Sequence, residues 1–380
     1  MTLNPTWRAL LPIYLSCLGY GVQAGAGMPL VPLALQQRGI DNVTIGLVEA
    51  AWGVGMIVTA HRVPAVAARL GAVPIVCAAL LSGALLAIVF AFTTSLPLWF
   101  VLSFLSGMVG GVPWVISEIW INLVVDEKQR GRAVGIYVAL MATGLALGPL
   151  ALQVVGVYGP RPFLSYAAMA VLVALPLLSS WRTAPAIEPE KGGNFLQVML
   201  MIPAVLVAAL ASGLGEQAAF SFLPIYALNA GVSAETGVTW LSAFVIGNIA
   251  LQWPIGWLSD HVDRRLVLAG CALISAALTA LLPLVDVHSS GILALLLFWG
   301  GISFAIYSVS LAVLGQRFSG GDIARANAAL TSVYTLGGMI GPPIGGTALD
   351  LVGRPGFGLS LAAFYLVAGV GALLALRKDG

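Results

Sequence analysis

The sequence predicts an all-α membrane protein with twelve transmembrane helices, arranged as two six-helix bundles related by pseudo-two-fold symmetry. Three observations predict this class. Of the 380 residues, 59% are hydrophobic and only 8% are charged, whereas soluble proteins carry about 25% charged residues. Twelve apolar runs are long enough to span a bilayer, and a glycine–proline pattern recurs in the two halves of the chain.

The spans follow from length and polarity, because a membrane-spanning helix needs about 20 apolar residues. Cutting the sequence at charged or turn-rich points gives spans over 9–35, 43–60, 72–92, 97–123, 133–156 and 162–181, and then over 197–228, 236–258, 266–285, 290–316, 326–350 and 357–376. The longest polar stretch, RTAPAIEPEKGGN at 182–194, separates six spans from six. We therefore expect an N-terminal bundle over 1–181, a cytoplasmic linker over 182–196 and a C-terminal bundle over 197–380.

The basic residues predict the orientation, because Lys and Arg collect on cytoplasmic loops. With the N-terminus inside, only Arg38, Arg161 and Arg354 of the 17 Lys and Arg fall outside, and the other 14 fall inside. One missed span would exchange the sides of every later loop, so this bias supports twelve spans. We expect both termini in the cytoplasm.

The two halves of the chain repeat each other. Sixteen residues separate Arg132 from Gly148, and sixteen separate Arg325 from Gly341; a proline follows each of these glycines. A shift of 193 residues superposes the fifth span on the eleventh. Parallel repeats about an axis along the membrane normal are typical of transporters with a substrate site near the midplane.

Several other classes of protein are disfavoured by what the sequence lacks. The net charge is only +2 and the basic residues are scattered, so we expect no nucleic-acid partner. No Gly-x4-Gly-Lys-Ser/Thr phosphate loop and no cluster of metal-ligating or catalytic residues is present, so we expect no cofactor, no metal and no enzyme activity. The cysteines lie in apolar runs and are expected to be buried thiols; they are Cys17, Cys77 and Cys271.

The loop that follows the eighth span carries a motif. Its sequence GWLSDHVDRR, at 256–265, resembles the Gly-x-x-x-Asp-Arg-x-Gly-Arg-Arg loop of the major facilitator superfamily, with His261 and Asp263 in place of arginine and glycine. The corresponding first-half loop has Ala68 where the aspartate would stand. The resemblance covers essentially the whole chain and implies gating roles, although a role in topology alone stays open for the arginines. The residues concerned are Asp260, Arg264, Arg265, Arg69 and Gly71.

The fifth span resembles a second motif of the superfamily. Its glycines are spaced Gly-x8-Gly-x3-Gly-Pro, as in proton-driven antiporters, although Leu152 and Gln153 replace the terminal glycine pair. Glycines four residues apart also let helix backbones approach closely in lipid, so packing alone is the alternative. The motif residues are Gly135, Gly144, Gly148 and Pro149, with Gly337, Gly341 and Pro342 in the eleventh span.

Three acidic residues, Glu49, Glu118 and Glu216, lie within spans. A carboxylate in hydrocarbon is costly, so such residues usually face the bundle interior and mark a pathway. Glu216 lies in mid-span, and we expect Gly213 and Gly215 to weaken the helix around it, as in the interrupted helices of transport sites. We expect Glu216 to be the main proton carrier and Glu118 a second acidic group or a cation anchor. The alternative for Glu118 is a hydrogen bond to Trp120 or to a neighbouring helix.

The resemblance also implies that the first, fourth, seventh and tenth spans line a central cavity. On these spans, polar and aromatic residues recur at helical spacing. Aromatic walls suit an amphipathic or apolar solute, and no Lys or Arg lies in mid-span to bind an anion. Packing stays the alternative role for the aromatic residues. The predicted cavity residues are Tyr20, Gln23, Trp114, Gln217, Phe220, Tyr226, Trp299, Ser303 and Tyr307.

The sequence thus predicts a secondary active transporter of the bacterial inner membrane. The favoured mode is proton-coupled antiport, which would export a small neutral or cationic, rather apolar compound by alternating access. One alternative is a facilitator or proton symporter that imports a small metabolite. Another is a membrane sensor or scaffold that transports nothing. We expect the chain to work as a monomer, with a small-molecule substrate, protons and the lipid bilayer as its partners.

Overall fold

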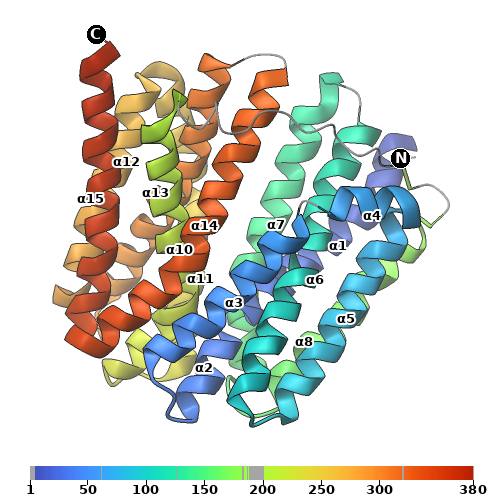
Figure 1. Cartoon of the computed structure of the whole chain (residues 1–380), viewed down its shortest axis with the longest axis horizontal. Helices are drawn as coiled ribbons and strands as arrows, with labels where there is room; N and C mark the ends of the chain where they lie inside the picture. Colours follow the sequence, from blue (N-terminus) through green and yellow to red (C-terminus); the bar gives the residue numbers. More distant parts are fainter. Residues whose placement is uncertain are drawn as a thin grey trace. The chain divides into compact units, whose positions relative to one another are not determined.

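The computed structural model of the protein describes residues 5–60, 62–125, 127–181, 184–185, 187, 201–318 and 321–379 (Figure 1). These residues are almost all helical, and the prediction of an all-α membrane protein is confirmed. The contacts divide the chain into two compact units. Unit 1 comprises the described residues of Met1–Ala34 and Ala51–Lys191, and unit 2 comprises those of Leu35–Ala50 and Gly192–Gly380.

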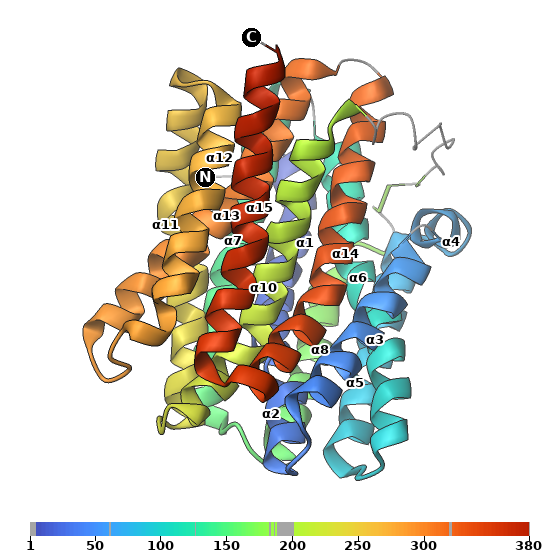
Figure 2. The ribbon, with the colours of Figure 1, turned by 60° about the vertical axis from the view of Figure 1, so that its left-hand side comes forward.

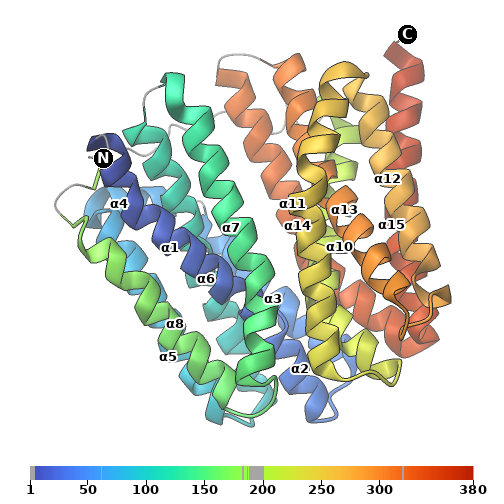
Figure 3. The same ribbon diagram turned by 180° about the vertical axis from the view of Figure 1, so that it is seen from behind.

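Unit 1 is a bundle in which α1 packs along α7 and α8, and α5 packs along α6 and α8. Figure 3 shows α1 beside α7. The helices of this part of the chain are α1 (Pro5–Gly27), α2 (Leu30–Gln37), α3 (Asn42–Ala60), α4 (Val63–Leu70), α5 (Ala72–Phe92), α6 (Leu96–Val124), α7 (Glu127–Val155) and α8 (Arg161–Leu178). The end of α2 and the first part of α3, up to Ala50, belong to unit 2.

In unit 2, α10 packs against α14, α11 against α13 and α12 against α15. Figure 2 shows α10 beside α14 and α15. The elements are α10 (Pro203–Asn229), α11 (Ala234–His261), α12 (Arg264–Leu281), the 3₁₀ turn η1 (Leu282–Leu284), α13 (Ser290–Arg317), α14 (Gly321–Val352) and α15 (Arg354–Asp379). Gln217 and Glu216 lie near the middle of α10, which places the central candidate residue inside this unit.

Ten helices of the described residues are long and apolar enough to cross a membrane. The predicted first and eleventh spans correspond to α1 with α2, and to α14. Both carry many glycine and polar residues, which lowers their hydropathy. The first span differs from its prediction, because α1 ends at Gly27 and α2 begins at Leu30. Pro29 lies at the break, where its missing N–H removes one helical hydrogen bond.

The structure leaves two predicted boundaries untested. The predicted linker over 182–196 lies largely outside the described residues, as does the predicted beginning of the 197–228 span. The sequence prediction also did not include α4, a short helix between α3 and α5. Gly71 ends α4 and precedes α5 with φ +89, a conformation that glycine adopts without strain.

The glycines of the antiporter-like motif lie where helix backbones touch. A methyl group on Gly144 of α7 would lie 2.3 Å from the carbonyl oxygen of Leu18 in α1. In unit 2, a methyl group on Gly337 of α14 would lie 2.1 Å from the carbonyl oxygen of Leu210 in α10. Gly135, by contrast, has no atom within 4 Å of such a methyl group. The contact between α1 and α7 thus recurs between α10 and α14, with the glycines 193 residues apart and their partners 192 residues apart.

A second pair of helices repeats in the same way. A methyl group on Gly107 of α6 would lie 1.9 Å from the carbonyl oxygen of Trp52 in α3. One on Gly300 of α13 would lie 1.9 Å from the carbonyl oxygen of Phe244 in α11. Gly107 and Gly300 are again 193 residues apart. In lipid the hydrophobic effect does not drive helices together, so close van der Waals packing of the backbones stabilises the pair instead. Small residues such as glycine allow that packing.

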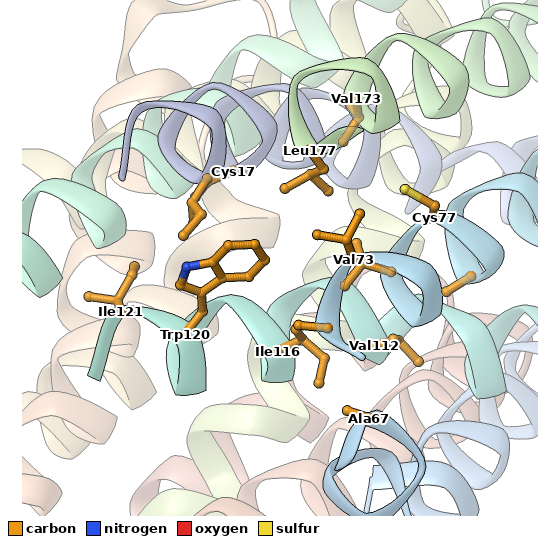
Figure 4. Close-up of a cluster of buried hydrophobic side chains, with 14 of the residues drawn as sticks. Cys17, Ala67, Val73, Cys77, Val112, Ile116, Trp120, Ile121, Val173 and Leu177 are labelled. Carbon is orange, nitrogen blue, oxygen red and sulfur yellow. The ribbon is translucent and has the colours of Figure 1, made fainter. Parts of the chain in front are cut away.

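The interior of unit 1 contains a cluster of apolar side chains from α1, α4, α5, α6, α7 and α8. Figure 4 shows the indole of Trp120 among Cys17, Ile116 and Leu177. Trp120 is only 2% exposed. Cys17, Cys77 and Cys271 are buried free thiols, as the sequence predicted.

Candidate functional site

The carboxyl group of Glu216 is buried inside unit 2, where it is only 2% exposed. Ser212, one turn earlier on α10, donates from its Oγ to Oε1 of Glu216 over 2.5 Å. Tyr334 of α14 donates from its hydroxyl to Oε2 over 2.6 Å. Each carboxyl oxygen therefore has its own hydroxyl partner, which is what a polar group needs when water is excluded.

The glycines beside Glu216 have a different role from the one that the sequence predicted. We expected Gly213 and Gly215 to weaken the helix, and this was wrong, because α10 runs without interruption from Pro203 to Asn229. A methyl group on Gly213 would lie 2.1 Å from the carbonyl oxygen of Tyr334. One on Gly215 would lie 1.9 Å from the hydroxyl of Tyr365. These glycines make room for the two tyrosines beside the carboxyl group.

The hydrogen bonds around Glu216 extend to two more helices. Ser212 Oγ also lies 2.9 Å from the carbonyl oxygen of Ser303 in α13. The hydroxyl of Ser303 pairs with that of Tyr365 in α15 over 2.6 Å. Ser212 and Ser303 are both fully buried. A connected polar network thus joins α10, α13, α14 and α15 in an otherwise apolar bundle.

Tyr307, another predicted cavity residue, borders this network. Its ring lies 4.8 Å from that of Tyr334, measured between centroids. Its hydroxyl pairs with Thr331 Oγ1 over 2.9 Å. The polar residues predicted on the 290–316 span are therefore brought next to Glu216 through α14.

The predicted aromatic residues of unit 2 are packed against other rings. The ring centroid of Trp299 lies 4.9 Å from that of Phe244, and Phe220 also contacts Phe244. Tyr226 contacts Trp240, and the guanidinium of Arg354 lies 5.9 Å from the centroid of its ring. Phe220, Tyr226 and Trp299 are all buried, whereas Gln217 is half-buried. Their assignment to a substrate cavity stays a prediction.

In unit 1, Glu118 is paired within its own helix. The indole Nε1 of Trp114 donates to Oε1 of Glu118 over 2.6 Å, one turn along α6. The two residues are four apart, which places them on one face of the helix. Trp114 is 45% exposed, and Glu118 is also exposed. The side chain of Asn122, on the same predicted face, lies outside the described residues.

Tyr20 and Gln23 of α1 contact neighbouring helices of unit 1. The hydroxyl of Tyr20 donates to the carbonyl oxygen of Gly110 in α6. The amide of Gln23 donates to the carbonyl oxygen of Tyr166 in α8 over 3.4 Å. Gln23 is only 3% exposed, and its Oε1 has no hydrogen-bond partner among the described residues.

The loop after α11 ties three helices of unit 2 together. Arg264 forms a 3.1 Å ion pair with Asp260 and donates to the carbonyl oxygen of Ala312 in α13 over 2.8 Å. The backbone N–H of Arg265 donates to the carboxylate of Asp263, which caps α12. The first-half loop has no such aspartate, and Arg69 is exposed there on α4.

Several polar contacts were not predicted from the sequence. Tyr334 lies on α14 and Tyr365 on α15. These helices correspond to the eleventh and twelfth predicted spans, whereas the predicted cavity residues lie on the first, fourth, seventh and tenth. Glu49 of α3 accepts a hydrogen bond from Ser221 of α10 over 3.2 Å. Asp350 accepts one from Asn42 over 2.6 Å. For a pair such as Glu49 and Ser221, the sequence shows only that an acid lies in one apolar run and a hydroxyl in another. It does not show that the two meet.

Comparison with known proteins gives a consistent result for the fold. The family model described as Major Facilitator Superfamily matches residues 13–239 and 205–379. A curated relative, "Uncharacterized MFS-type transporter YfkF" of Bacillus subtilis, is 25% identical over 257 residues. That match covers 65% of this chain and 65% of the relative, so the chain spans about two thirds of the relative's length.

Solved structures match the chain over nearly all of its length. The nucleoside transporter NupG superposes with a TM-score of 0.79 at 14% identity, covering 97% of this chain and 99% of that one. A D-xylose-proton symporter superposes with a TM-score of 0.75 at 15% identity, covering 97% of each. At such low identity these matches show the fold alone, and they confirm the predicted arrangement of transmembrane helices.

Proposed function

Since the chain belongs to the major facilitator superfamily and is a multi-pass membrane transporter of small molecules, we propose that it is a proton-coupled antiporter. It exports a small neutral or cationic, rather apolar compound by alternating access. The observation that carries this proposal is the position of Glu216, a carboxyl group with 2% exposure in the middle of a membrane helix. Buried acidic groups in membrane helices are expensive and are generally retained for function.

The partners of Glu216 suit a group that gains and loses a proton. Ser212 and Tyr334 offer hydroxyls, and a hydroxyl both donates and accepts hydrogen bonds. The same two partners can therefore satisfy the carboxylate as an acceptor and the carboxylic acid as a donor. A permanently charged partner such as arginine would favour the carboxylate alone. In our proposal, Glu216 takes a proton from the outside and releases it inside, in alternation with substrate.

Glu118 has a second role in this mechanism. It lies beside the partly exposed indole of Trp114 on α6. A carboxylate attracts a cation, and the face of an indole does so as well. We infer that this pair anchors the cationic end of a substrate, or acts as a second acidic group that exchanges protons.

The substrate class follows from the charges of the membrane helices. No Lys or Arg lies in the middle of any predicted span. Sites for phosphate or carboxylate generally use arginine or lysine for charge and hydrogen bonding. The proposed substrate is therefore neutral or cationic, and the predicted aromatic residues favour an apolar body.

The proposal includes a place and an orientation in the cell. The bacterial relatives and the basic loops support the inner membrane, with both termini in the cytoplasm. We propose that one chain suffices for transport, with residues 1–181 and 197–380 as the two moving bundles. The gating residues we propose are Asp260, Arg264 and Arg265 after α11, and Arg69 and Gly71 at the corresponding first-half loop.

The first experiment is a thermal-stability screen of the purified protein against a broad panel of compounds. A ligand at 100 times its Kd stabilises the folded protein by about 2.7 kcal/mol. The best compound is then loaded into proteoliposomes, and its flux is followed under an imposed pH gradient. Antiport predicts that the compound moves against the direction in which protons flow. Flux that is unaffected by the gradient would refute proton coupling.

The second candidate function is a facilitator or proton symporter that imports a small metabolite. A D-xylose-proton symporter has the same fold, which supports keeping this alternative. In the same vesicles, symport predicts movement of the compound and protons in one direction. Membership of a transporter family argues against the sensor or scaffold that the sequence left open.

A further inference from the structure

Ser212 is placed between two acceptors that it cannot serve at the same time. Its Oγ lies 2.5 Å from Oε1 of Glu216 and 2.9 Å from the carbonyl oxygen of Ser303. A serine hydroxyl carries one hydrogen and so donates one hydrogen bond at a time. A carbonyl oxygen and an ionised carboxylate can only accept. While Glu216 is ionised, one of the two acceptors therefore goes without this donor.

We propose that Ser212 transmits the protonation state of Glu216 from α10 to α13. With Glu216 ionised, the Ser212 hydrogen points to Oε1, and the Ser303 carbonyl lacks this bond. When Oε1 takes a proton from a hydronium ion, which is left as water, the new O–H donates to Ser212 Oγ, and the Ser212 hydroxyl turns to the Ser303 carbonyl. One proton enters and no other covalent bond changes. The inference rests on the proposed role of Glu216 as proton carrier, and Ser212 acts in it as a positioning residue.

Burial makes the choice of acceptor matter. Ser212 and Ser303 are 0% exposed, and Glu216 is 2% exposed, so bulk water does not replace the missing bond. The Ser303 carbonyl keeps its helical hydrogen bond within α13, so what it gains or loses is its second hydrogen bond, the one that crosses to α10. Protonation of Glu216 therefore changes how strongly α10 holds α13 at this point.

The change at Ser303 extends to a further helix. The side-chain hydroxyl of Ser303 pairs with Tyr365 of α15 over 2.6 Å. Tyr365 in turn lies against α10 at Gly215. The site of protonation is thereby connected to three of the helices that pack around it, and Ser212 is the point at which the connection switches.

The other ionisable groups near Glu216 do not compete for this role. The titratable side chains that interact with it are Tyr334 of α14 and Tyr365 of α15, and the ring of Tyr307 of α13 contacts that of Tyr334 at a tilt. Tyrosine hydroxyls keep their protons near neutral pH. Glu49 of α3 reaches α10 five residues further on, where it accepts from Ser221 and not from Ser212. Other charged residues of the surrounding helices lie toward the helix ends; they include Glu235, Asp260, His261, Arg264, Arg265, Arg317, Arg325, Asp350 and Arg354.

Two measurements on the full chain in lipid nanodiscs test the proposal. Infrared spectroscopy during a pH titration follows the protonated carboxyl band that Glu216→Gln removes. Hydrogen–deuterium exchange, corrected for the pH dependence of intrinsic exchange, follows the segment of α13 around Ser303. The variants are Ser212→Ala and Ser212→Thr, with Ser221→Ala as the matched control. Ser221 is an equally buried serine of α10, but it donates to Glu49.

In wild type, we expect exchange around Ser303 to slow by about three- to fivefold as the carboxyl band appears, the factor that one hydrogen bond carries. Ser212→Ala should lose this change, while Ser212→Thr and Ser221→Ala should keep it. If Ser212→Ala does not fold, Ser212→Cys replaces it, because a thiol is a weak donor. A change that persists without the hydroxyl, or that Ser221→Ala also abolishes, overturns the proposal.

The infrared arm separates this inference from the proposed function. If no carboxyl band that depends on Glu216 appears at any pH, Glu216 carries no proton and the proposed function fails. If the band titrates but removal of the Ser212 hydroxyl leaves α13 unchanged, only the role of Ser212 is refuted.

Discussion

The hydroxyl of Tyr334 donates to Oε2 of Glu216 over 2.6 Å, and this contact joins α14 to α10 inside unit 2. The backbone of Tyr334 approaches Gly213 so closely that a methyl group there would lie 2.1 Å from its carbonyl oxygen. The glycine and the tyrosine thus act together, since the first lets the helices approach and the second then reaches the carboxyl group. A substitution at this contact should therefore change both the free energy of unfolding and the properties of the Glu216 carboxyl group.

Tyr334→Phe should lower the free energy of unfolding by about 1 kcal/mol, the usual size of one hydrogen bond. The cost should be smaller in the Glu216→Gln background, because the carboxylate that is left without its donor is then absent. Thermal unfolding of the four proteins of this double-mutant cycle measures the coupling. Tyr14→Phe, which removes a hydrogen bond to Ala133 in unit 1, is the control. Strict additivity of Tyr334→Phe and Glu216→Gln would contradict the contact.

Gly144→Ala should destabilise the protein by about 1–3 kcal/mol, the usual cost of overpacking. The added methyl group would lie 2.3 Å from the backbone oxygen of Leu18, which cannot move aside alone. Gly135→Ala on the same helix is the matched control, because nothing lies within 4 Å of its methyl group. That control should be neutral or stabilising by up to about 1 kcal/mol. Equal melting temperatures for the two variants would refute the proposed packing of α1 on α7.

Arg264→Ala should destabilise the protein more than Asp260→Asn. The ion pair of these residues is partly exposed, with 65% of the Asp260 side chain accessible, and such pairs contribute about 0–1 kcal/mol. Arg264 also donates to the carbonyl oxygens of Ser259 in α11 and Ala312 in α13, so it joins the two helices. Melting temperatures at low and high salt test this. The Asp260→Asn effect should vanish at high salt, whereas that of Arg264→Ala should persist. The opposite pattern would contradict the role of the Arg264 hydrogen bonds in joining the helices.

Asp41, just before α3, should make stability depend on pH in the acid range. The backbone N–H and hydroxyl of Thr44 donate to its carboxylate over 2.9 and 2.8 Å. The N–H bond, followed by the hydroxyl bond, lowers the pKa of Asp41 below the ordinary value of 3.8. A lowered pKa in the folded state gives stability that is present above 3.8 and is lost as the pH falls through the lowered pKa.

Wild type should therefore be more stable than Asp41→Ala at pH 6, and the difference should shrink as the pH falls toward 3. Thermal unfolding at a series of pH values measures it. Thr44→Val, which removes the hydroxyl donor and keeps the N–H, should show an intermediate effect. A difference between wild type and Asp41→Ala that grows on acidification would contradict the assignment.

The sequence predicted the helices well, because long apolar runs bounded by charges leave few alternatives in a membrane. The 72–92 span was predicted with the bounds of α5. The first span was wrong in its middle, since the break at Pro29 lies within an apolar run that is long enough to conceal it. The repeat was visible because glycines at close backbone contacts, such as Gly144 and Gly337, must keep their spacing.

The surroundings of the candidate site were harder to predict. Glu216 was found because an acid in an apolar run is conspicuous, but its partner Tyr334 lies 118 residues away on another helix. Tertiary packing brings these two residues together, and the sequence around either one does not predict the contact. Gly213 and Gly215 were misinterpreted because a glycine can weaken a helix or admit a neighbour, and only the neighbour distinguishes the two. For Glu118 the sequence suggested Trp120 as a hydrogen-bond partner, whereas the structure pairs Glu118 with Trp114, four residues earlier on the same helix face.

The most direct test of the central claim, that Glu216 carries the transported proton, compares pH-gradient-driven flux in proteoliposomes of wild type and Glu216→Gln. The probe is the compound that stabilises wild type best in the thermal screen. The account predicts that Glu216→Gln still binds this compound and exchanges it across the membrane, but no longer moves it against its gradient when a pH gradient is imposed. Gradient-driven flux in Glu216→Gln with the rate and pH dependence of wild type would contradict it.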